Sequence, residues 1–290
     1  MVRKNIFEIL ESKYDINNEL EKIKSLFYSG LISHSYMDSY LYQKTVTYNY
    51  IHMVKDVFYS WKGRGTCTSC ANMRQELGID KIENKSTRTV DEIVVCLEYY
   101  DNISRLYVKK VLPELNEYEY QTLPEANVLK SNIDTLLNHL NMEEIYIKKY
   151  DAIIIVPKNP AATAVAEISS EDTAMAILMY HHASLKGQLE EKRKLLLTIA
   201  REYEPLLNKG IDGFKPYFDN ARNMLNNVHL RHNNKEGKDK IEKIAQMPDE
   251  ELENWYDELY QLLLFCVLIK DNKERKDKMT EFLKGLKEKK

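Results

Sequence analysis

Arginine, asparagine and histidine side chains are concentrated in one short stretch of the sequence, residues 216–234. Arg222, Asn226 and His229 are spaced four and then three residues apart, so a helix through this stretch places them on one face. Cleavage of an RNA strand without a metal needs a base for the 2′-hydroxyl proton and a cation for the phosphate. Histidine titrates near neutral pH, and arginine stays charged and can bind two phosphate oxygens. This chemistry makes the three residues the first candidates for a catalytic site.

Neighbouring residues extend the candidate site. Asn223 and Asn226 could orient the histidine or the phosphate, while Arg231 and His232 follow at the point where the helix should end. We therefore predict that Asn226, Arg231 and His232 bind substrate. The alternative is an ordinary solvated helix face, on which Arg, Asn and His are common and a histidine near the C-terminus is favoured by the helix dipole. The residues alone leave both interpretations open.

The order of Arg222, Asn223 and His229, with six residues between arginine and histidine, resembles the motif of the HEPN superfamily. The continuation over residues 230–234 also resembles abortive-infection proteins. Members of the superfamily are small helical bundles, and many are metal-independent endoribonucleases of abortive-infection and toxin systems. The resemblance covers residues 165–290 at most. It implies that Arg222, Asn223 and His229 are catalytic, and that a homodimer forms through the face bearing Arg222.

Two functional hypotheses follow. In the first, the chain is an endoribonuclease effector of an abortive-infection, antiphage-defence or toxin system, and its C-terminal bundle cuts RNA without a metal or cofactor. In the second, it is a non-enzymatic helical protein of phage or host-defence context that binds another protein or RNA. Under either hypothesis the N-terminal domain is a regulatory or partner-binding module.

The composition limits the class of protein. With 290 residues, 43% hydrophobic and 30% charged, the chain can bury a sizeable core. Lys+Arg 42 against Asp+Glu 45 argues against a wholly basic nucleic-acid coat, although not against a local basic groove. The longest apolar run, residues 262–269, is far shorter than the roughly 20 residues that span a bilayer. Four cysteines without a secretory signal predict reduced thiols in a cytoplasmic protein with no membrane contact.

Cysteine and histidine pairs elsewhere do not predict a metal site. Cys67 and Cys70 have the spacing of half a zinc site or of a redox pair, but no second pair of ligands follows at a convincing distance. His181 and His182 lack a nearby carboxylate cluster that would complete a metal site. We therefore expect no metal and no cofactor.

The predicted fold is mainly α, with two helical domains and a small β-hairpin between them. Residues 1–143 form the N-terminal domain, with helices at 5–12 and 16–29. The tyrosine-rich segment 35–61 fits strands by propensity, but its approximate helical rhythm favours a helix. Later helices of this domain run from Val90 to about Val111, and from Pro124 through Leu140.

The second half of the chain contains the candidate site. Residues 144–160 form a hairpin connector, with strands at 144–148 and 152–156. Residues 161–290 are predicted to form an antiparallel four-helix-type bundle. Its predicted helices lie at 161–168, 171–183, 187–208 and 216–231, followed by an apolar helix from Pro248 to Ile269 and a charged helix over 273–290.

Overall fold

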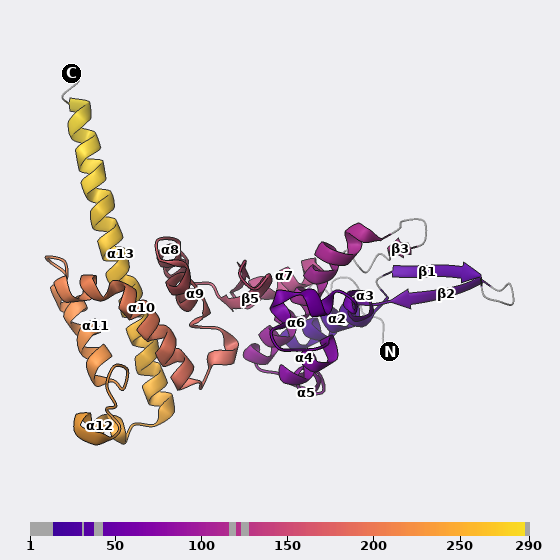
Figure 1. Ribbon diagram of the computed structural model, residues 1–290, viewed down its shortest axis with the longest axis horizontal. Helices are drawn as coiled ribbons and strands as arrows, with labels where there is room; N and C mark the ends of the chain where they lie inside the picture. The colour runs from indigo at the N-terminus through magenta and orange to yellow at the C-terminus, as the bar shows by residue number, and fades with distance from the viewer. Residues whose placement is uncertain (1–13, 31, 38–42, 116–119, 123–127, 288–290) are drawn as a thin grey trace. The chain divides into compact units, whose positions relative to one another are not determined.

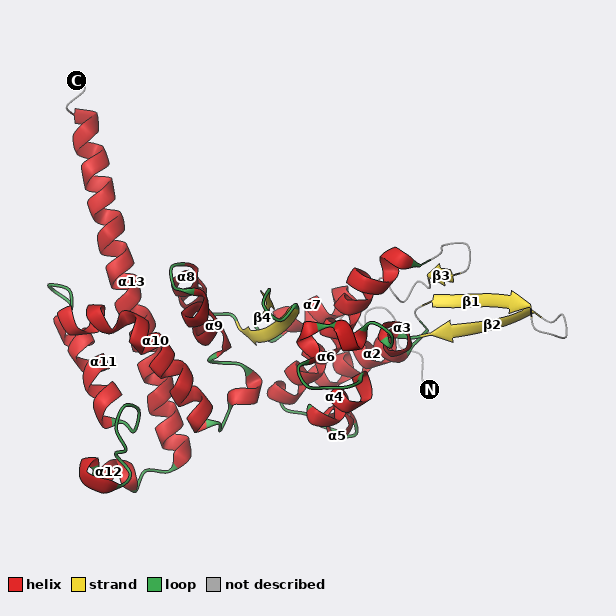
Figure 2. Cartoon of the chain, viewed as in Figure 1, coloured by secondary structure: helices red, strands yellow, loops and turns green. Residues whose placement is uncertain are grey.

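The computed structural model describes residues 14–30, 32–37, 43–115, 120–122 and 128–287 (Figure 1). The protein is mainly helical with a small antiparallel hairpin, as the sequence predicts (Figure 2). The chain divides into two compact units, Met1–Pro157 and Lys158–Lys290. The helix expected over residues 5–12 lies outside the described residues. Among the described helices, none combines the length and apolar character needed to cross a bilayer.

The first unit mixes helices with two antiparallel sheets. In chain order its elements are α2 (Ile16–Tyr28), β1 (Ile32–Met37), β2 (Gln43–Tyr48), α3 (Tyr50–Val54), α4 (Cys70–Glu76), α5 (Ile79–Glu83), α6 (Val90–Leu106), β3 (Tyr120–Thr122), α7 (Leu129–His139), β4 (Met142–Ile147) and β5 (Ala152–Pro157). The sheets have the strand orders β2-β1-β3 and β4-β5.

The helix predicted over residues 35–61 is wrong in its first half. β1 and β2 pair there as antiparallel strands, with Ser33 opposite Thr47 and Ile32 opposite Tyr48. The β-branched and aromatic residues of β2 favour a strand, and pairing with β1 supplies its backbone hydrogen bonds. Helix α3 begins only at Tyr50, after the Asn49 side chain has accepted a hydrogen bond from the backbone N–H of His52 (3.1 Å).

Helix α6 forms the centre of the first unit. It begins with a capping box, in which Thr89 and Glu92 each bind the other's backbone N–H. Ile93, Leu97 and Ile103 are completely buried along it. After Leu106 the chain continues through a π-helical turn over residues 107–111.

The hairpin of β4 and β5 lies against α6 and belongs to the first unit. The Asn102 side chain donates to the carbonyl of Ile153 (2.9 Å) and accepts from its N–H (2.8 Å). The Glu98 carboxylate accepts from the N–H of Ile155 (2.7 Å). Side chains of α6 therefore form hydrogen bonds with the backbone groups of β5 that do not face β4.

The second unit is a helical bundle. Its helices are α8 (Pro160–Glu167), α9 (Glu171–Met179), α10 (Leu189–Lys209), α11 (Lys215–Asn227), α12 (Glu242–Ala245) and α13 (Asp249–Lys287). α10 packs against α9, α11 and α13, and α13 also contacts α8 and α11. Residues on the facing sides of α10 and α13, such as Leu196, Ile199, Leu252 and Leu259, are completely buried.

A buried lysine joins α10 to α13. Lys192 Nζ lies 2.8 Å from a carboxylate oxygen of Glu253 and 2.8 Å from one of Asp257. The same ammonium lies 5.1 Å from the centre of the Tyr180 ring, which stacks on Tyr260. These contacts fix the relative positions of three parts of the bundle.

α13 is one uninterrupted helix of 39 residues. The charged segment predicted from Lys273 continues the apolar segment without a break, and it projects past the other helices of its unit (Figure 1). Every side chain from Asn272 to Leu286 is exposed.

Candidate functional site

Helix α11 holds the first part of the predicted site. Pro216 lies in its first turn, and Phe218, Ala221 and Leu225 bury its apolar stripe completely. The helix ends at Asn227, four residues earlier than predicted at 231. The prediction that Arg222, Asn226 and His229 share one helix face is therefore wrong for His229, which lies beyond the helix.

The chain turns sharply at His229, whose φ is 54°. The backbone N–H of Arg231 donates to the carbonyl of Leu225 (3.0 Å), and the Leu230 side chain is completely buried. Asn234, only 2% exposed, accepts from the N–H of His229 (2.8 Å) and donates to the carbonyl of Asp239 (3.1 Å). The two hydrogen bonds of this asparagine hold the turn in place. The position of His229 therefore depends on the burial of Leu230 and Asn234.

Arg222 lies apart in contacts of its own. One of its terminal nitrogens lies 2.7 Å from Asp219 Oδ1, one turn earlier on the same helix. Asn223 is exposed, and its carbonyl accepts from the side chain of Asn227 (2.9 Å). The arginine therefore already has an anionic partner.

Two of the predicted substrate-binding residues contact each other. Arg231 donates to Asn226 Oδ1 (3.4 Å) and forms an ion pair with Glu204 of α10. His232 is half exposed, with Nδ1 3.9 Å from Asp239 Oδ2. The structure thus brings Asn226 and Arg231 together, and His232 pairs with a different part of the loop.

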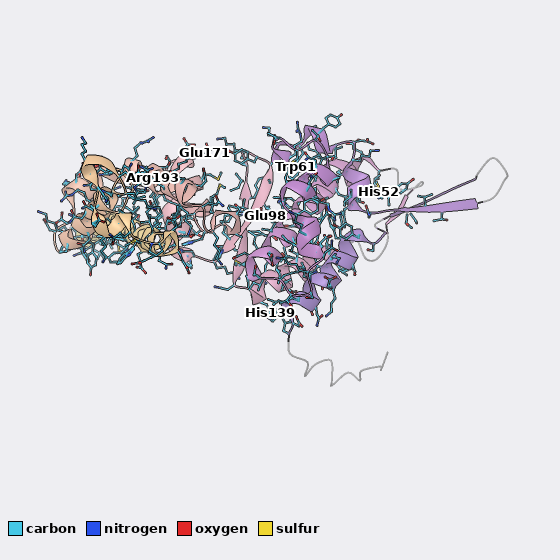
Figure 3. The ribbon with its side chains drawn as sticks, turned by 90° about the horizontal axis from the view of Figure 1, so that it is seen from below. His52, Trp61, Glu98, His139, Glu171 and Arg193 are labelled. Atoms are coloured by element: carbon cyan, nitrogen blue, oxygen red, sulfur yellow. The ribbon has the colours of Figure 1, made fainter. Side chains whose placement is uncertain are left out.

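His229 has a different set of neighbours. Its carbonyl accepts from the Tyr256 hydroxyl (3.1 Å), and the next carbonyl, that of Leu230, accepts from Arg193 Nε (2.8 Å). Arg193, labelled in Figure 3, lies on α10. Lys235 acts on His229 electrostatically and pairs with Asp249 at the start of α13 (2.8 Å). Arg193 could not be predicted as a neighbour of His229, because no local spacing in the sequence connects α10 with this turn.

The surroundings of His229 favour the neutral form of its imidazole. Partial burial lowers its pKa from the usual value, and the positive charges of Arg193 and Lys235 lower it further, against the opposing charges of Glu190 and Asp249. Its Nδ1 is buried and finds no hydrogen-bond partner within the described parts of the chain. A neutral imidazole beside two cations can accept a proton while the cations bind an anion.

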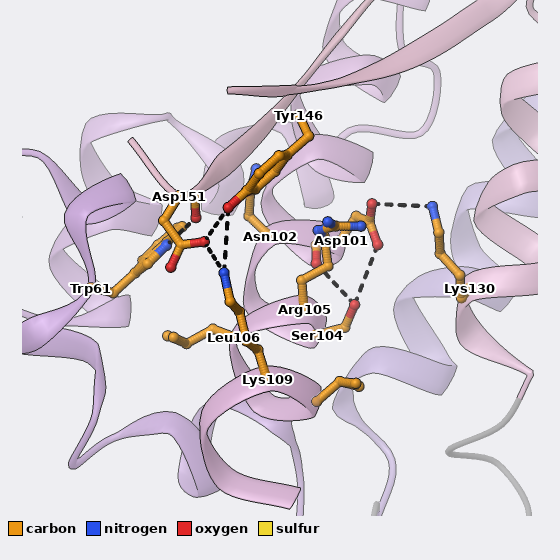
Figure 4. A pocket seen from close by; sticks show the side chains of 11 residues that line it. Trp61, Asp101, Asn102, Ser104, Arg105, Leu106, Lys109, Lys130, Tyr146 and Asp151 are labelled. Carbon is orange, nitrogen blue, oxygen red and sulfur yellow. Dashed lines mark hydrogen bonds and ion pairs between the residues drawn. The ribbon is translucent and has the colours of Figure 1, made fainter. Parts of the chain in front are cut away.

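The first unit contains a cavity of about 570 Å³ that the sequence did not predict (Figure 4). Trp61, Leu106 and Val108 contribute apolar walls, and the end of α6, α7 and the hairpin contribute charged groups. The Tyr146 hydroxyl donates to Asp151 (2.7 Å), and the Arg105 guanidinium lies 5.6 Å from the centre of the Tyr146 ring. In the sequence, this cavity is indicated only by the charged residues that interrupt the apolar pattern of α6.

A cluster of acids and one lysine borders this cavity. Lys130 Nζ lies 3.2 Å from the fully buried Asp101 and also pairs with Glu144. Burial raises the pKa of Glu144 to about 7, and the nearby charge of Asp101 adds to the increase, while Lys130 opposes it. This carboxyl can therefore exchange a proton near neutral pH.

Cys67 and Cys70 remain free thiols, and burial raises the pKa of Cys70 to about 11. Within the described residues, no three His, Cys, Asp or Glu side chains gather closely enough to hold a metal ion.

No protein-family model, no curated protein and no solved structure matched the chain. The relationship to the HEPN superfamily therefore stays a prediction.

Proposed function

We propose that the second unit is a metal-independent endoribonuclease, with His229 as its general base. The resemblance of this region to the HEPN superfamily suggests RNA as the substrate and abortive infection, antiphage defence or a toxin system as the context. The proposal keeps the predicted histidine and changes the cations that accompany it.

The observation that carries the proposal is the state of His229. A non-glycine residue with positive φ is uncommon, and such residues cluster at functional sites. A buried nitrogen without a hydrogen-bond partner also requires an explanation in a native structure. Its lowered pKa leaves the imidazole neutral and able to accept a proton at physiological pH.

Arg193 and Lys235 fit the role of phosphate-binding cations better than Arg222. Both act electrostatically on His229, and Arg222 is not among the charges that shift its pKa. Each of the three cations also has an acidic partner: Asp219 for Arg222, Glu190 for Arg193 and Asp249 for Lys235. Arg193 uses Nε for the Leu230 carbonyl and one terminal nitrogen for Glu190, which is 3.4 Å away. Its second terminal nitrogen can still donate to a phosphate oxygen.

The proposed reaction is internal transesterification. His229 takes the 2′-hydroxyl proton, and the 2′-oxygen attacks the adjacent phosphorus. The bond from phosphorus to the 5′-oxygen breaks, and that oxygen takes a proton from water. The hydroxide that remains takes the proton from His229, which regenerates the base. Arg193 and Lys235 balance the additional negative charge that develops on the phosphate oxygens. The products are a 2′,3′-cyclic phosphate and a 5′-hydroxyl end.

The test is cleavage of end-labelled RNA by the purified full chain in the presence of EDTA. Loss of a general base costs about 10²–10⁴-fold in rate, so His229→Ala should be slower by that factor with little change in RNA affinity. His232→Ala is the contrasting variant, because His232 lies in the same loop, is half exposed and is predicted to bind substrate. Its loss should lower RNA affinity and leave the rate of the chemical step largely unchanged. Equal rates for wild type and His229→Ala would exclude the proposed base.

The cations are tested in the same assay. Arg193→Ala should reduce both rate and affinity more than Arg222→Ala does, and circular dichroism checks that the bundle remains folded. The wild-type rate should rise with pH below the usual histidine range and level off by pH 7, because the pKa of His229 is lowered. If Arg222→Ala reduced rate and affinity more than Arg193→Ala, the result would favour Arg222 as the cation that works with His229.

The second candidate function is non-enzymatic binding of RNA or protein. It is favoured by the ion pairs that already occupy Arg222 and Arg231, with Asp219 and Glu204 respectively. Under this hypothesis the RNA stays intact, and wild type and His229→Ala bind it equally well.

A further inference from the structure

The exposed end of α13 carries an apolar stripe. Met279, Phe282, Leu283 and Leu286 are between 51% and 66% exposed. A helical segment without tertiary contacts is only marginally stable in water, because packing of an amphipathic face supplies most helix stability in proteins. Contiguous exposed apolar side chains commonly mark an interaction surface.

This stripe belongs to a longer pattern along the same helix, which we call the seam. Its residues alternate in steps of four and three, as in a coiled coil: Phe265, Ile269, Asn272, Lys276, Met279, Leu283 and Leu286. Both ends of the seam are apolar, and its two central positions are polar.

The first half of the seam borders an open hollow of about 520 Å³. Phe265 and Ile269 form one wall, and Ile211 and Phe214 from the segment between α10 and α11 form another. The hollow and the stripe therefore lie on one helix. The hollow offers apolar space, and the stripe offers apolar side chains that are more than half exposed to solvent.

We propose that a second copy of this chain docks antiparallel along α13, so that the end of each helix covers the hollow of the other copy. Leu283 of one copy then faces the half-exposed Phe265 of the other. Met279 lies over Ile269, which is 8% exposed and forms the floor of the hollow. The central layer pairs Lys276 with Asn272, whose amide oxygen can accept from the ammonium group. A two-fold axis passes beside Glu274, so one surface serves both copies.

The side chain that would face Lys276 distinguishes this arrangement from the others. A parallel pair would place Lys276 against Lys276 of the other copy. An antiparallel pair shifted by one heptad would bury Lys276 against Met279 or Phe265. Of these antiparallel pairs, only the proposed register aligns polar with polar and apolar with apolar side chains along the seam. The parallel pair also matches polarity, but it brings two lysines together.

The surface differs from the face bearing Arg222 and is independent of the proposed nuclease activity. Lys273 and Arg275 of both copies approach one another near the axis, so added salt should screen their repulsion and strengthen the dimer. Binding to RNA phosphates would respond to salt in the opposite direction.

The test is sedimentation equilibrium of the full chain over a concentration series. Wild type should be a dimer. Leu283→Glu should weaken it roughly 100-fold or more, because each dimer loses two buried leucines. Lys284→Glu is the control, since Lys284 is the next residue and lies outside the seam. Leu283 is exposed within its own chain, so its replacement leaves the bundle folded.

A second substitution tests the register. Adding Phe265→Lys to Leu283→Glu places opposite charges face to face twice in the proposed dimer, so association should return. In a parallel dimer the same two changes place like charges together and give no recovery. Failure of this rescue overturns the register, and a monomeric wild type overturns the dimer. A monomer that instead sediments with vesicles of anionic lipid would assign the stripe to a membrane surface.

Discussion

Both units contain a lysine that joins several carboxylates, but the two groups are packed differently. In the first unit Lys130 pairs with Asp101, Asp134 and Glu144, and its side chain is 42% exposed. In the second unit Lys192 pairs with Glu253 and Asp257, and its side chain is 6% exposed. The first group has an excess of acids beside a cavity, whereas the second has its cation enclosed by the bundle.

The two groups contain the same residue types, so the difference in packing determines whether such a group exchanges a proton or joins helices. Burial raises the pKa of Glu144 to about 7, and the nearby charge of Asp101 adds to the increase, so this carboxyl keeps a proton near neutral pH. Lys192 has a structural role, because it connects two carboxylates of α13 with the Tyr180 ring.

The largest effect should come from removing the enclosed lysine. Lys192→Ala leaves the mostly buried Glu253 and the partly exposed Asp257 without their cation, and should lower the unfolding free energy of the second unit by roughly 3 kcal/mol. Lys194→Ala, at an exposed position two residues away, should change it by less than about 0.5 kcal/mol. Urea unfolding followed by Trp255 fluorescence in a Trp61→Phe background measures both. Equal losses would contradict the structural role of Lys192.

A smaller loss of unfolding free energy should appear in the first unit when the pH is raised. The folded pKa of Glu144 lies above its unfolded value, so its contribution to stability is complete below about pH 4.5 and is lost as pH rises through about 7. The loss should be roughly 1–3 kcal/mol, measured through Trp61 in a Trp255→Phe background. Glu144→Gln should flatten this part of the profile, whereas Glu143→Gln, on the preceding strand position, should retain it.

The smallest effect should appear in the second unit, with the opposite sign. Burial lowers the pKa of His181; Asp257 opposes this change, and Lys192 adds to it. The contribution of His181 is therefore complete above the unfolded histidine pKa and decreases on acidification. His181→Gln should reduce the loss of stability between pH 7.5 and 5.5, again followed through Trp255. A second unit that gains stability on acidification would contradict this expectation.

Much of the fold follows from local patterns in the sequence. The apolar periodicity of α6, α10 and α13 predicts helices that the structure contains. The hairpin is also predicted, because two β-rich runs stand on either side of a short turn. The strands β1 and β2 were missed, since their stability comes from pairing with each other, and β1 pairs in addition with β3 at residues 120–122, far along the chain.

The candidate site was predictable only in part. Arg222 and Asn226 do lie on α11, but the end of that helix depends on the burial of Leu230 and Asn234, which no local spacing reveals. Arg193 reaches the turn from a different helix. Likewise, Asp101, Lys130 and Glu144 come from three separate elements, so only the folded chain shows that they share a proton-exchanging group.

The attachment of the hairpin to α6 has a consequence for the behaviour of the chain in concentrated solution. Residues 152–156 are a run of small and β-branched apolar residues without a charge, the kind of segment that readily adds to strands of other molecules. Asn102 and Glu98 occupy the backbone groups through which such an addition would begin. Two polar side chains of a buried helix thus protect the strand against aggregation, even though they contribute to no sheet themselves.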